Sequence, residues 1–316
     1  MNESASGSLL EGIHVLDGAM ATELEARGAV LDGPLWSARV LEEAPEKIAA
    51  VHRAYIEAGA DCIETASYQV SRMGFAEAGY PPERADSALL GAVELARDAA
   101  AAFPERRVLV AASLGPYGAA LHNGAEYTGF YGCTFAELVS FHRERIAVLA
   151  AADGRQRPDL LAFETLPSLE EARALGQALG DFPALPAWFS FTCVDNAHVA
   201  HGERLRDCAA LVDVLPQTVA IGINCTHPGL IVGLIGEIRA VSRKPVVVYP
   251  NSGEGWDAEQ RCWTGWRDAE GFEALAASWF RAGAQMAGGC CRTGPDYVRA
   301  IAQAYRRMGG NGMVRG

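Results

Sequence analysis

Two adjacent cysteines stand in the sequence Gly288-Gly289-Cys290-Cys291-Arg292-Thr293, which follows a short apolar run, 284–287, and precedes a helix that we expect to begin near Pro295. Both thiols can serve one site only if the backbone bends there, and the two glycines permit such a bend. A third cysteine, Cys225, ends another apolar run, 219–224. Two strand ends could therefore offer three thiols to one point, a donor set that suits zinc and leaves a fourth position open. The alternative is a pair of ordinary buried or redox-active thiols.

The run before the two cysteines is the last of eight short apolar runs. They occupy 14–16, 61–64, 108–113, 160–163, 187–191, 219–223, 246–249 and 285–288. Most of them are too continuous for half-exposed strands and are typical of parallel strands buried on both faces. Stretches of helical periodicity separate the runs. Two of these stretches begin with a capping-box pattern, at 134–137 and 168–171, and Gly59 and Gly283 stand where helices should end.

Eight strand–helix units predict a single-domain (β/α)₈ barrel over residues 13–310. The alternative is an open doubly wound sheet, which would want a glycine-rich phosphate loop after its first strand. The sequence at that point, Asp17-Gly18-Ala19-Met20-Ala21-Thr22, has no such pattern. We expect a disordered tail at 1–12 and a short C-terminal tail at 311–316.

The composition limits the class of protein. The chain has 316 residues, of which 50% are hydrophobic, enough for one large core. Its net charge of −12 argues against nucleic acid and anionic membranes as partners. No apolar run reaches membrane-spanning length, and the N-terminus lacks the features of a signal peptide. We therefore expect a cytoplasmic protein with free thiols, either a monomer or a weak oligomer.

In a barrel the chemistry lies at the carboxyl ends of the strands, and polar residues follow nearly every run. These residues are Asp17, Thr65, Ser113, Glu164, Thr192, Asn224 and Asn251. The loops 115–133, 193–203 and 252–270 are long and should shape a pocket. The carboxylates of Asp17 and Glu164 could hold an ammonium group or act as acid and base, and the sequence does not separate these two roles. We favour either role over the simpler alternative, a helix-cap or turn residue.

Other residues that could carry chemistry have a simpler interpretation. The five remaining cysteines have no partner pattern and are expected to be packing or surface residues: Cys62, Cys133, Cys193, Cys208 and Cys262. His198 and His201 lack the spacing of a metalloprotease motif. Four tryptophans fall in predicted loops, where a lid or packing role is expected: Trp36, Trp256, Trp263 and Trp266.

Four segments resemble the homocysteine S-methyltransferase family. They are Asp17-Gly18-Ala19-Met20-Ala21-Thr22-Glu23-Leu24, Phe163-Glu164-Thr165-Leu166-Pro167, Gly222-Ile223-Asn224-Cys225-Thr226 and Gly288-Gly289-Cys290-Cys291-Arg292-Thr293. The resemblance spans nearly the whole chain and implies a (β/α)₈ barrel with one zinc ion per chain, held by Cys225, Cys290 and Cys291. It implies L-homocysteine as a substrate, bound around Asp17, Gly18, Ala19, Thr65, Glu164 and Asn224. Asp17 and Glu164 would hold its amino group, and the backbone near Gly18 its carboxylate.

Within this family the sequence is most similar to the short enzymes that use S-methylmethionine. The similarity lies in the segments 34–39, 65–69, 115–118 and 249–254. The betaine-using branch has a tyrosine where this chain has Gln69, and it has a long C-terminal arm that this chain lacks. The implied donor pocket contains Trp36, Gln69, Tyr249 and Asn251.

The implied reaction is transfer of a methyl group from a sulfonium donor, S-methylmethionine or S-adenosylmethionine, to the zinc-bound thiolate of homocysteine, which gives methionine. A sulfonium leaves as a neutral thioether, so no acid is needed. Most of the rate gain should come from alignment. Three alternatives stay open: a methyltransferase for selenocysteine or another thiol, a zinc-dependent lyase or hydrolase with Glu164 as base, and a non-catalytic zinc or thiol sensor.

Overall fold

The computed structural model describes residues 9–31, 35, 37–257, 262–264 and 269–309. Its centre is a seven-stranded parallel sheet with the order β1-β2-β3-β4-β5-β6-β9. The strands are β1 (Cys62–Glu64), β2 (Leu109–Leu114), β3 (Leu160–Leu166), β4 (Ala187–Phe191), β5 (Thr218–Asn224), β6 (Val246–Tyr249) and β9 (Met286–Ala287). The spatial order follows the chain order, so this sheet has no point at which the order reverses. That excludes the doubly wound alternative.

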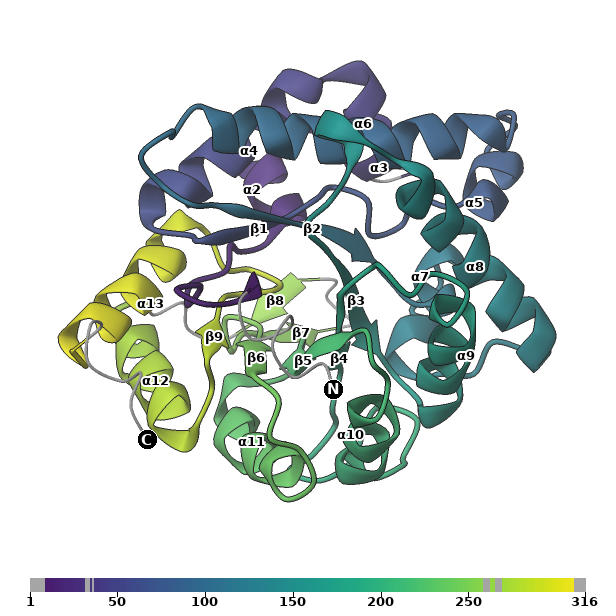
Figure 1. Cartoon of the computed structure of the whole chain (residues 1–316). Coiled ribbons are helices and arrows are strands. Elements are labelled where there is room, and N and C mark those ends of the chain that lie inside the picture. The colour runs from purple at the N-terminus through teal and green to yellow at the C-terminus, as the bar shows by residue number, and fades with distance from the viewer. Residues whose placement is uncertain (1–8, 32–34, 36, 258–261, 265–268, 310–316) are drawn as a thin grey trace.

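Helices cover the outside of the curled sheet (Figure 1). The α-helices are α2 (Met20–Ala26), α3 (Ser37–Glu43), α4 (Pro45–Ala58), α5 (Arg72–Glu77), α6 (Glu83–Ala101), α7 (Tyr117–Ala120), α8 (Phe135–Ala151), α9 (Leu169–Leu179), α10 (Leu205–Asp213), α11 (Ile231–Arg239), α12 (Ala269–Ala282) and α13 (Pro295–Arg307). Short 3₁₀ turns are η1 (Ala125–Tyr127), η2 (Gly154–Gln156) and η3 (Pro228–Leu230). The predicted alternation of strand and helix is therefore confirmed over most of the chain.

The first of the eight predicted strands, 14–16, is not a regular strand. Val15 forms a single parallel bridge to Ala287 of β9, and Leu16 forms one to Cys62 of β1. The segment thus lies between the two edge strands, but it is only three residues long before the chain turns at Asp17. The eight-stranded barrel is consequently confirmed only as a curled sheet of seven parallel strands in one domain.

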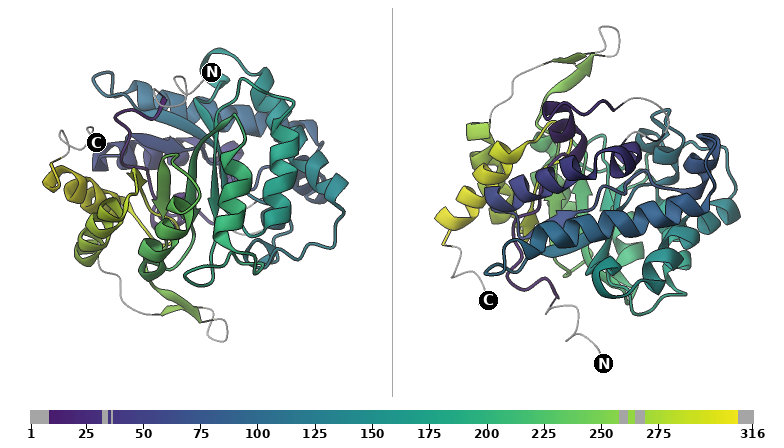
Figure 2. Two further views of the ribbon diagram at one scale, coloured as in Figure 1. Left: turned by 60° about the horizontal axis from the view of Figure 1, so that its bottom comes forward. Right: turned by 90° about the horizontal axis from the view of Figure 1, so that it is seen from above.

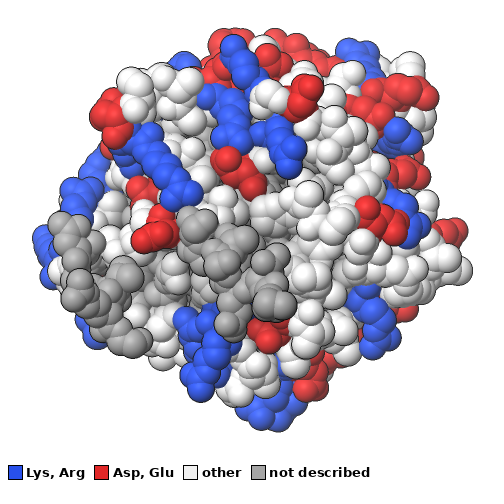
Figure 3. Space-filling model, in the orientation of Figure 1, with Lys and Arg blue, Asp and Glu red and all other residues white. Residues whose placement is uncertain are grey.

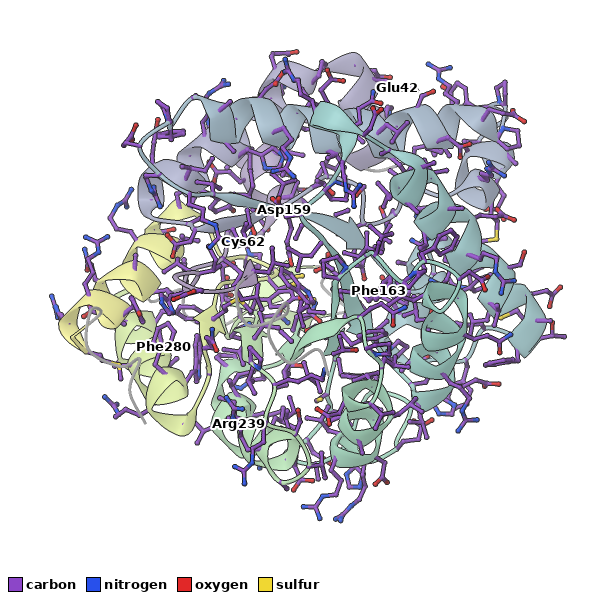
Figure 4. The ribbon with its side chains drawn as sticks, viewed as in Figure 1. Glu42, Cys62, Asp159, Phe163, Arg239 and Phe280 are labelled. Carbon is purple, nitrogen blue, oxygen red and sulfur yellow. The ribbon has the colours of Figure 1, made fainter. Side chains whose placement is uncertain are left out.

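The two faces of the curled sheet have different neighbours. Alternate strand residues form a small inner cluster that includes Leu16, Cys62, Trp188 and Tyr249. The other set, with Phe163 among them, packs under the helices in the main hydrophobic core. Figure 4 labels Cys62 and Phe163 among the side chains around the sheet. The strands are apolar throughout because both faces are covered.

The predicted helix ends are mostly confirmed. Thr134 and Glu137 form a reciprocal capping box at the start of α8. Ser168 caps α9 by accepting the backbone N–H of Glu171, but the Glu171 side chain turns inward and does not complete the box. Gly59 and Gly283 follow α4 and α12 with φ angles of 121° and 109°, a conformation that favours glycine.

Two further segments differ from expectation. The predicted loop 252–270 contains an antiparallel hairpin of β7 (Gly255–Asp257) and β8 (Cys262–Thr264), which extends from the body of the protein in Figure 2. Residues 9–12, which we placed in the N-terminal tail, pack on the fold: Leu10 is buried, and Arg107 donates to the carbonyls of Leu9 and Glu11 at 2.6 and 2.7 Å. The other domain bounds stay predictions.

The surface carries charges of both signs. On the face shown in Figure 3, basic and acidic side chains alternate over short distances among the described residues. Within the described part of the chain, no helix is both long and apolar enough to cross a membrane.

Candidate metal and substrate site

The structure brings the three singled-out thiols together. Cys225 follows β5, and Cys290 and Cys291 follow β9. The Sγ atom of Cys225 lies 3.0 Å from that of Cys290 and 3.5 Å from that of Cys291. All three sulfur atoms lie within 4.8 Å of one another. A tight group of three sulfur donors at one edge of a cavity fits a tetrahedral, thiophilic metal ion with one position left for another ligand.

Local backbone geometry makes this convergence possible. Cys225 has a φ of 50° and Arg292 one of 69°. The chain therefore turns sharply at Cys225 and again directly after Cys291. Gly289 is needed for close packing, because a Cβ atom there would lie 2.1 Å from the Thr293 hydroxyl oxygen. Thr293 in turn donates to the Cys290 carbonyl at 2.6 Å. Hydrogen bonds from the thiols of Cys225 and Cys290 lower the pKa of the Cys291 thiol.

The thiols open into a cavity of about 620 Å³ at the carboxyl ends of the strands. Of the predicted substrate residues, Asp17, Gly18, Ala19, Thr65 and Glu164 line it, together with all three cysteines. The residues meet because the carboxyl ends of parallel strands share one edge of the sheet.

Three carboxyl groups lie together in this cavity. Asp17 accepts the backbone N–H of Glu64 at 2.9 Å, and the Ser113 hydroxyl donates to Glu164. Burial raises the pKa of Glu164 to about 7. Burial, and then the charge of Glu164, also raise the pKa of Asp17 and Glu64 above their usual values. A cation that binds among these three carboxyls stabilises their ionised forms, since its charge offsets the cost of burying theirs.

Glu64 was not among the predicted site residues. It ends β1 two residues after Cys62, so the two side chains lie on the same, inner face of the sheet. That alternation was a usable signal in the sequence. Tyr68, Glu126 and Tyr127 also line the cavity, and the Tyr127 hydroxyl lies 3.5 Å from the Cys225 sulfur. Glu126 and Tyr127 belong to the irregular loop after β2, where no periodic pattern marked them.

Three predicted substrate contacts form hydrogen bonds within the protein itself. Asn224 is fully buried and does not line the cavity in the described structure; its amide holds Thr165, with contacts of 2.7 and 2.8 Å. The backbone N–H of Ala19 donates to the Thr293 carbonyl at 2.9 Å. Thr65 lines the cavity, and its hydroxyl oxygen also accepts the Ser113 N–H at 3.0 Å.

The predicted donor pocket is only partly assembled. Gln69 and Tyr249 line the cavity, whereas Asn251 is not among the described lining residues. The Tyr249 hydroxyl accepts the indole N–H of Trp188 at 3.2 Å. Trp36 and Trp266 lie outside the described residues, and Trp256 and Trp263 pair through their backbones in the β7–β8 hairpin.

The remaining cysteines and histidines that were considered as site residues lie apart from the three clustered thiols. Cys62, Cys193 and Cys208 are buried in the hydrophobic clusters, and Cys133 is partly buried against the main hydrophobic core. His198 and His201 pair with Asp195 and Glu203 at 2.9 and 3.0 Å.

Known proteins resemble this chain along nearly its full length. Residues 14–305 match the family model described as homocysteine S-methyltransferase. The homocysteine S-methyltransferase YbgG of Bacillus subtilis is 45% identical, with 93% of this chain and 95% of YbgG covered. A selenocysteine Se-methyltransferase of Brassica oleracea is 43% identical, with 92% of this chain and 88% of the relative covered.

A solved structure shows the same fold. The metallated form of the homocysteine methyltransferase MmuM from Escherichia coli superposes with a TM-score of 0.82 at 42% sequence identity. The superposition covers 94% of this chain and 98% of that one.

Proposed function

Because the chain belongs to the homocysteine S-methyltransferase family, we propose that it transfers a methyl group from a sulfonium donor, S-methylmethionine, to the thiol of L-homocysteine. With that donor both products are methionine. The observation that carries the proposal is the meeting, in one cavity, of three thiols and a group of buried carboxyls. The thiols suit a metal that holds a substrate sulfur, and the carboxyls suit the ammonium of an amino acid.

Zinc is the metal we propose, one ion per chain, held by Cys225, Cys290 and Cys291. Three thiolates are a donor set that zinc takes in catalytic sites. That the related MmuM has a metallated form supports a metal in this fold, and the three clustered cysteines are where we place it. When bound, the ion would keep a substrate thiol in its thiolate form at neutral pH.

Asp17 and Glu164 would bind the ammonium group of homocysteine. The pKa of Glu164, which burial raises to about 7, should fall when a cation binds beside it, so the residue would be ionised in the complex. The substrate carboxylate would meet the backbone at Gly18 and the first residues of α2, which line the same cavity. These contacts fix the amino acid at one end and leave its thiol directed toward the three cysteines.

The carboxyl groups in this proposal bind the substrate and do not transfer protons. A sulfonium donor releases a neutral thioether, which requires no general acid. The chain's contribution is alignment: holding acceptor sulfur and methyl carbon in line can be worth about 7–11 kcal/mol of the barrier. The cavity of about 620 Å³ leaves room for a donor beside homocysteine, and we place the donor against Gln69, Tyr68 and Tyr127, which line the cavity.

Selenocysteine is a second candidate acceptor. The reason is the 43% identity to a selenocysteine Se-methyltransferase over most of both chains. A selenol is more acidic than a thiol, so it would depend less on the three cysteines for ionisation. The cytoplasmic location and the monomeric or weakly associated state remain predictions.

A turnover assay tests the proposal. The purified protein is incubated with homocysteine or selenocysteine and with S-methylmethionine, S-adenosylmethionine or betaine in turn. We expect two methionines per homocysteine consumed with S-methylmethionine and none with betaine. Methionine from betaine at a comparable rate would contradict the donor assignment. Hydrolysis of the donors without homocysteine would favour the hydrolase, and metal binding without any turnover would favour the sensor.

A further inference from the structure

The cavity contains more carboxyl groups than homocysteine alone explains. Five carboxyl groups line it among the described residues: Asp17, Glu25, Glu64, Glu126 and Glu164. The single guanidinium in the described lining, that of Arg292, lies 3.3 Å from Glu254. The ammonium of homocysteine requires no more than two or three of these carboxyls. A second cationic ligand is therefore expected in the same cavity.

Glu126 differs from the other carboxyls in its place on the fold. It comes from η1, in the loop after β2, whereas Asp17, Glu64 and Glu164 come from the ends of the sheet. One of its carboxylate oxygens is buried and has no hydrogen-bond partner in the described structure. Its electrostatic neighbours include the Cys291 thiol and Tyr68. The next residue, Tyr127, places its hydroxyl 3.5 Å from the Cys225 sulfur.

The loop that carries Glu126 is held by packing and by hydrogen bonds to the rest of the protein. Gly118 packs so closely on η1 that a Cβ atom there would lie 2.4 Å from the Glu126 nitrogen. The Tyr131 hydroxyl donates to Glu171 at 2.5 Å, and Glu171 is fully buried beside His142 at 3.0 Å. The Gly118 contact therefore fixes the backbone at Glu126, and the Tyr131 contact fixes the later part of the same loop.

The covalent structure of the donor determines which of its two positive charges lies nearest to the three cysteines. The methyl group must point at the acceptor sulfur, which lies at the three cysteines, so the sulfonium sulfur is within one bond of the transferred carbon. The donor's ammonium is attached three carbons further away. The donor charge nearest to a carboxylate beside the three cysteines is consequently that of the sulfonium. Tyr68 and Tyr127 line the same cavity, and aromatic rings also favour a cation.

We propose that the Glu126 carboxylate binds the sulfonium charge of the methyl donor and so makes the enzyme select cationic donors; this inference rests on the proposed function. The sulfonium charge disappears when the methyl group leaves. The attraction to Glu126 therefore holds the donor, and its loss after transfer lets the neutral thioether product dissociate. Glu126 should therefore influence donor binding more than the rate of the bound complex.

Glu126→Gln in the zinc-loaded enzyme tests this, because the amide keeps the size and removes the charge. The probe is 2-amino-5-methylhexanoate, in which carbon replaces the sulfonium sulfur while the ammonium and carboxylate remain. At saturating homocysteine we expect kcat/KM for S-methylmethionine to fall about tenfold to a hundredfold, mainly through KM, because the variant loses the Coulomb attraction between carboxylate and sulfonium. The inhibition constant of the carbon analogue should change less than about twofold, since it has no charge at the position of the sulfonium sulfur for Glu126 to bind. Zinc content should be unchanged, and Glu57→Gln, on the exposed side of α4, is the matched control.

Two results would overturn the inference alone. An inhibition constant that rises in parallel with the donor KM would show that Glu126 holds the ammonium or the loop. An unchanged KM for S-methylmethionine, in a variant whose parent turns over normally, would show that it does not bind the donor. If the parent itself forms no methionine from homocysteine and a sulfonium, the proposed function fails and this inference fails with it.

Discussion

The amide of Asn224 holds Thr165 at two points: its oxygen accepts the Thr165 backbone N–H at 2.7 Å, and its N–H donates to the Thr165 hydroxyl at 2.8 Å. Thr165 has a φ of 58°, which is unfavourable for a β-branched residue. It directly follows Glu164, so the amide of one strand end fixes the carboxylate of another. We therefore interpret Asn224 as a positioning residue and not as the substrate contact that was expected from the sequence.

Asn224→Ala should therefore destabilise the protein and also weaken homocysteine binding. Two buried polar groups of Thr165 lose their partner, which costs about 2–4 kcal/mol in the free energy of unfolding. Denaturant unfolding and the KM for homocysteine are the measurements. Gln177→Ala, at an exposed position of α9, is the control and should change neither. A variant with normal stability but a raised KM would instead indicate a direct substrate contact.

Each of the three clustered cysteines should be required for the metal. Cys225→Ser, Cys290→Ser and Cys291→Ser should each lose most bound zinc and nearly all activity, because a hydroxyl is a much poorer zinc ligand than a thiolate. Circular dichroism should show that the fold remains. Cys62→Ala, on the inner face of the sheet and away from the thiol group, should keep its zinc. Full metal occupancy in any of the three serine variants would remove that cysteine from the site.

Glu164→Gln separates substrate binding from proton transfer. If the carboxylate binds the ammonium of homocysteine, its loss should weaken binding about tenfold to a hundredfold, with some loss of kcat and no loss of zinc. The thiol 3-mercaptopropionate, which has no amino group, should be a poor acceptor for the parent and should lose little more in the variant. Equal loss of turnover for both thiols, with homocysteine affinity intact, would assign Glu164 to the chemistry.

The same substitution should stabilise the substrate-free protein in a pH-dependent way. Glu164 has an ordinary pKa of 4.5 and a folded pKa of about 7, because burial favours its neutral form. As pH rises from 4.5 to 7 the unfolded chain loses this proton first, so the parent loses stability over that window and none is regained above it. The free-energy advantage of Glu164→Gln over the parent should be about 2 kcal/mol larger at pH 8.5 than at pH 5.5. An equal difference at both values would show that Glu164 is not buried as a neutral group.

Continuous apolar runs and helical periodicity predicted most of the fold, because parallel strands that are buried on both faces are apolar throughout. The pattern did not show that residues 14–16 would be too short for a regular strand, since strand length depends on where the chain turns at Asp17. It also predicted a full capping box at Ser168, where the Glu171 side chain instead joins a buried tertiary network with His142. Local sequence cannot report such competition between a cap and a distant partner.

The sequence predicted those residues of the site that directly follow a strand. Cys225, Cys290, Cys291, Asp17 and Glu164 meet because parallel strands end at one edge of the sheet. Glu126 and Tyr127 were not predictable, because their loop is placed by contacts with residues far along the chain. Asn224 was placed at the correct edge, but which of its neighbours takes its hydrogen bonds depends on the three-dimensional structure.

The central claim is that the three cysteines hold a zinc ion to which the homocysteine sulfur is added. X-ray absorption at the zinc edge tests it directly, on the zinc-loaded enzyme with and without homocysteine. We predict three sulfur neighbours and one lighter atom without the substrate, and four sulfur neighbours with it. An unchanged set of neighbours after homocysteine has bound would contradict the account.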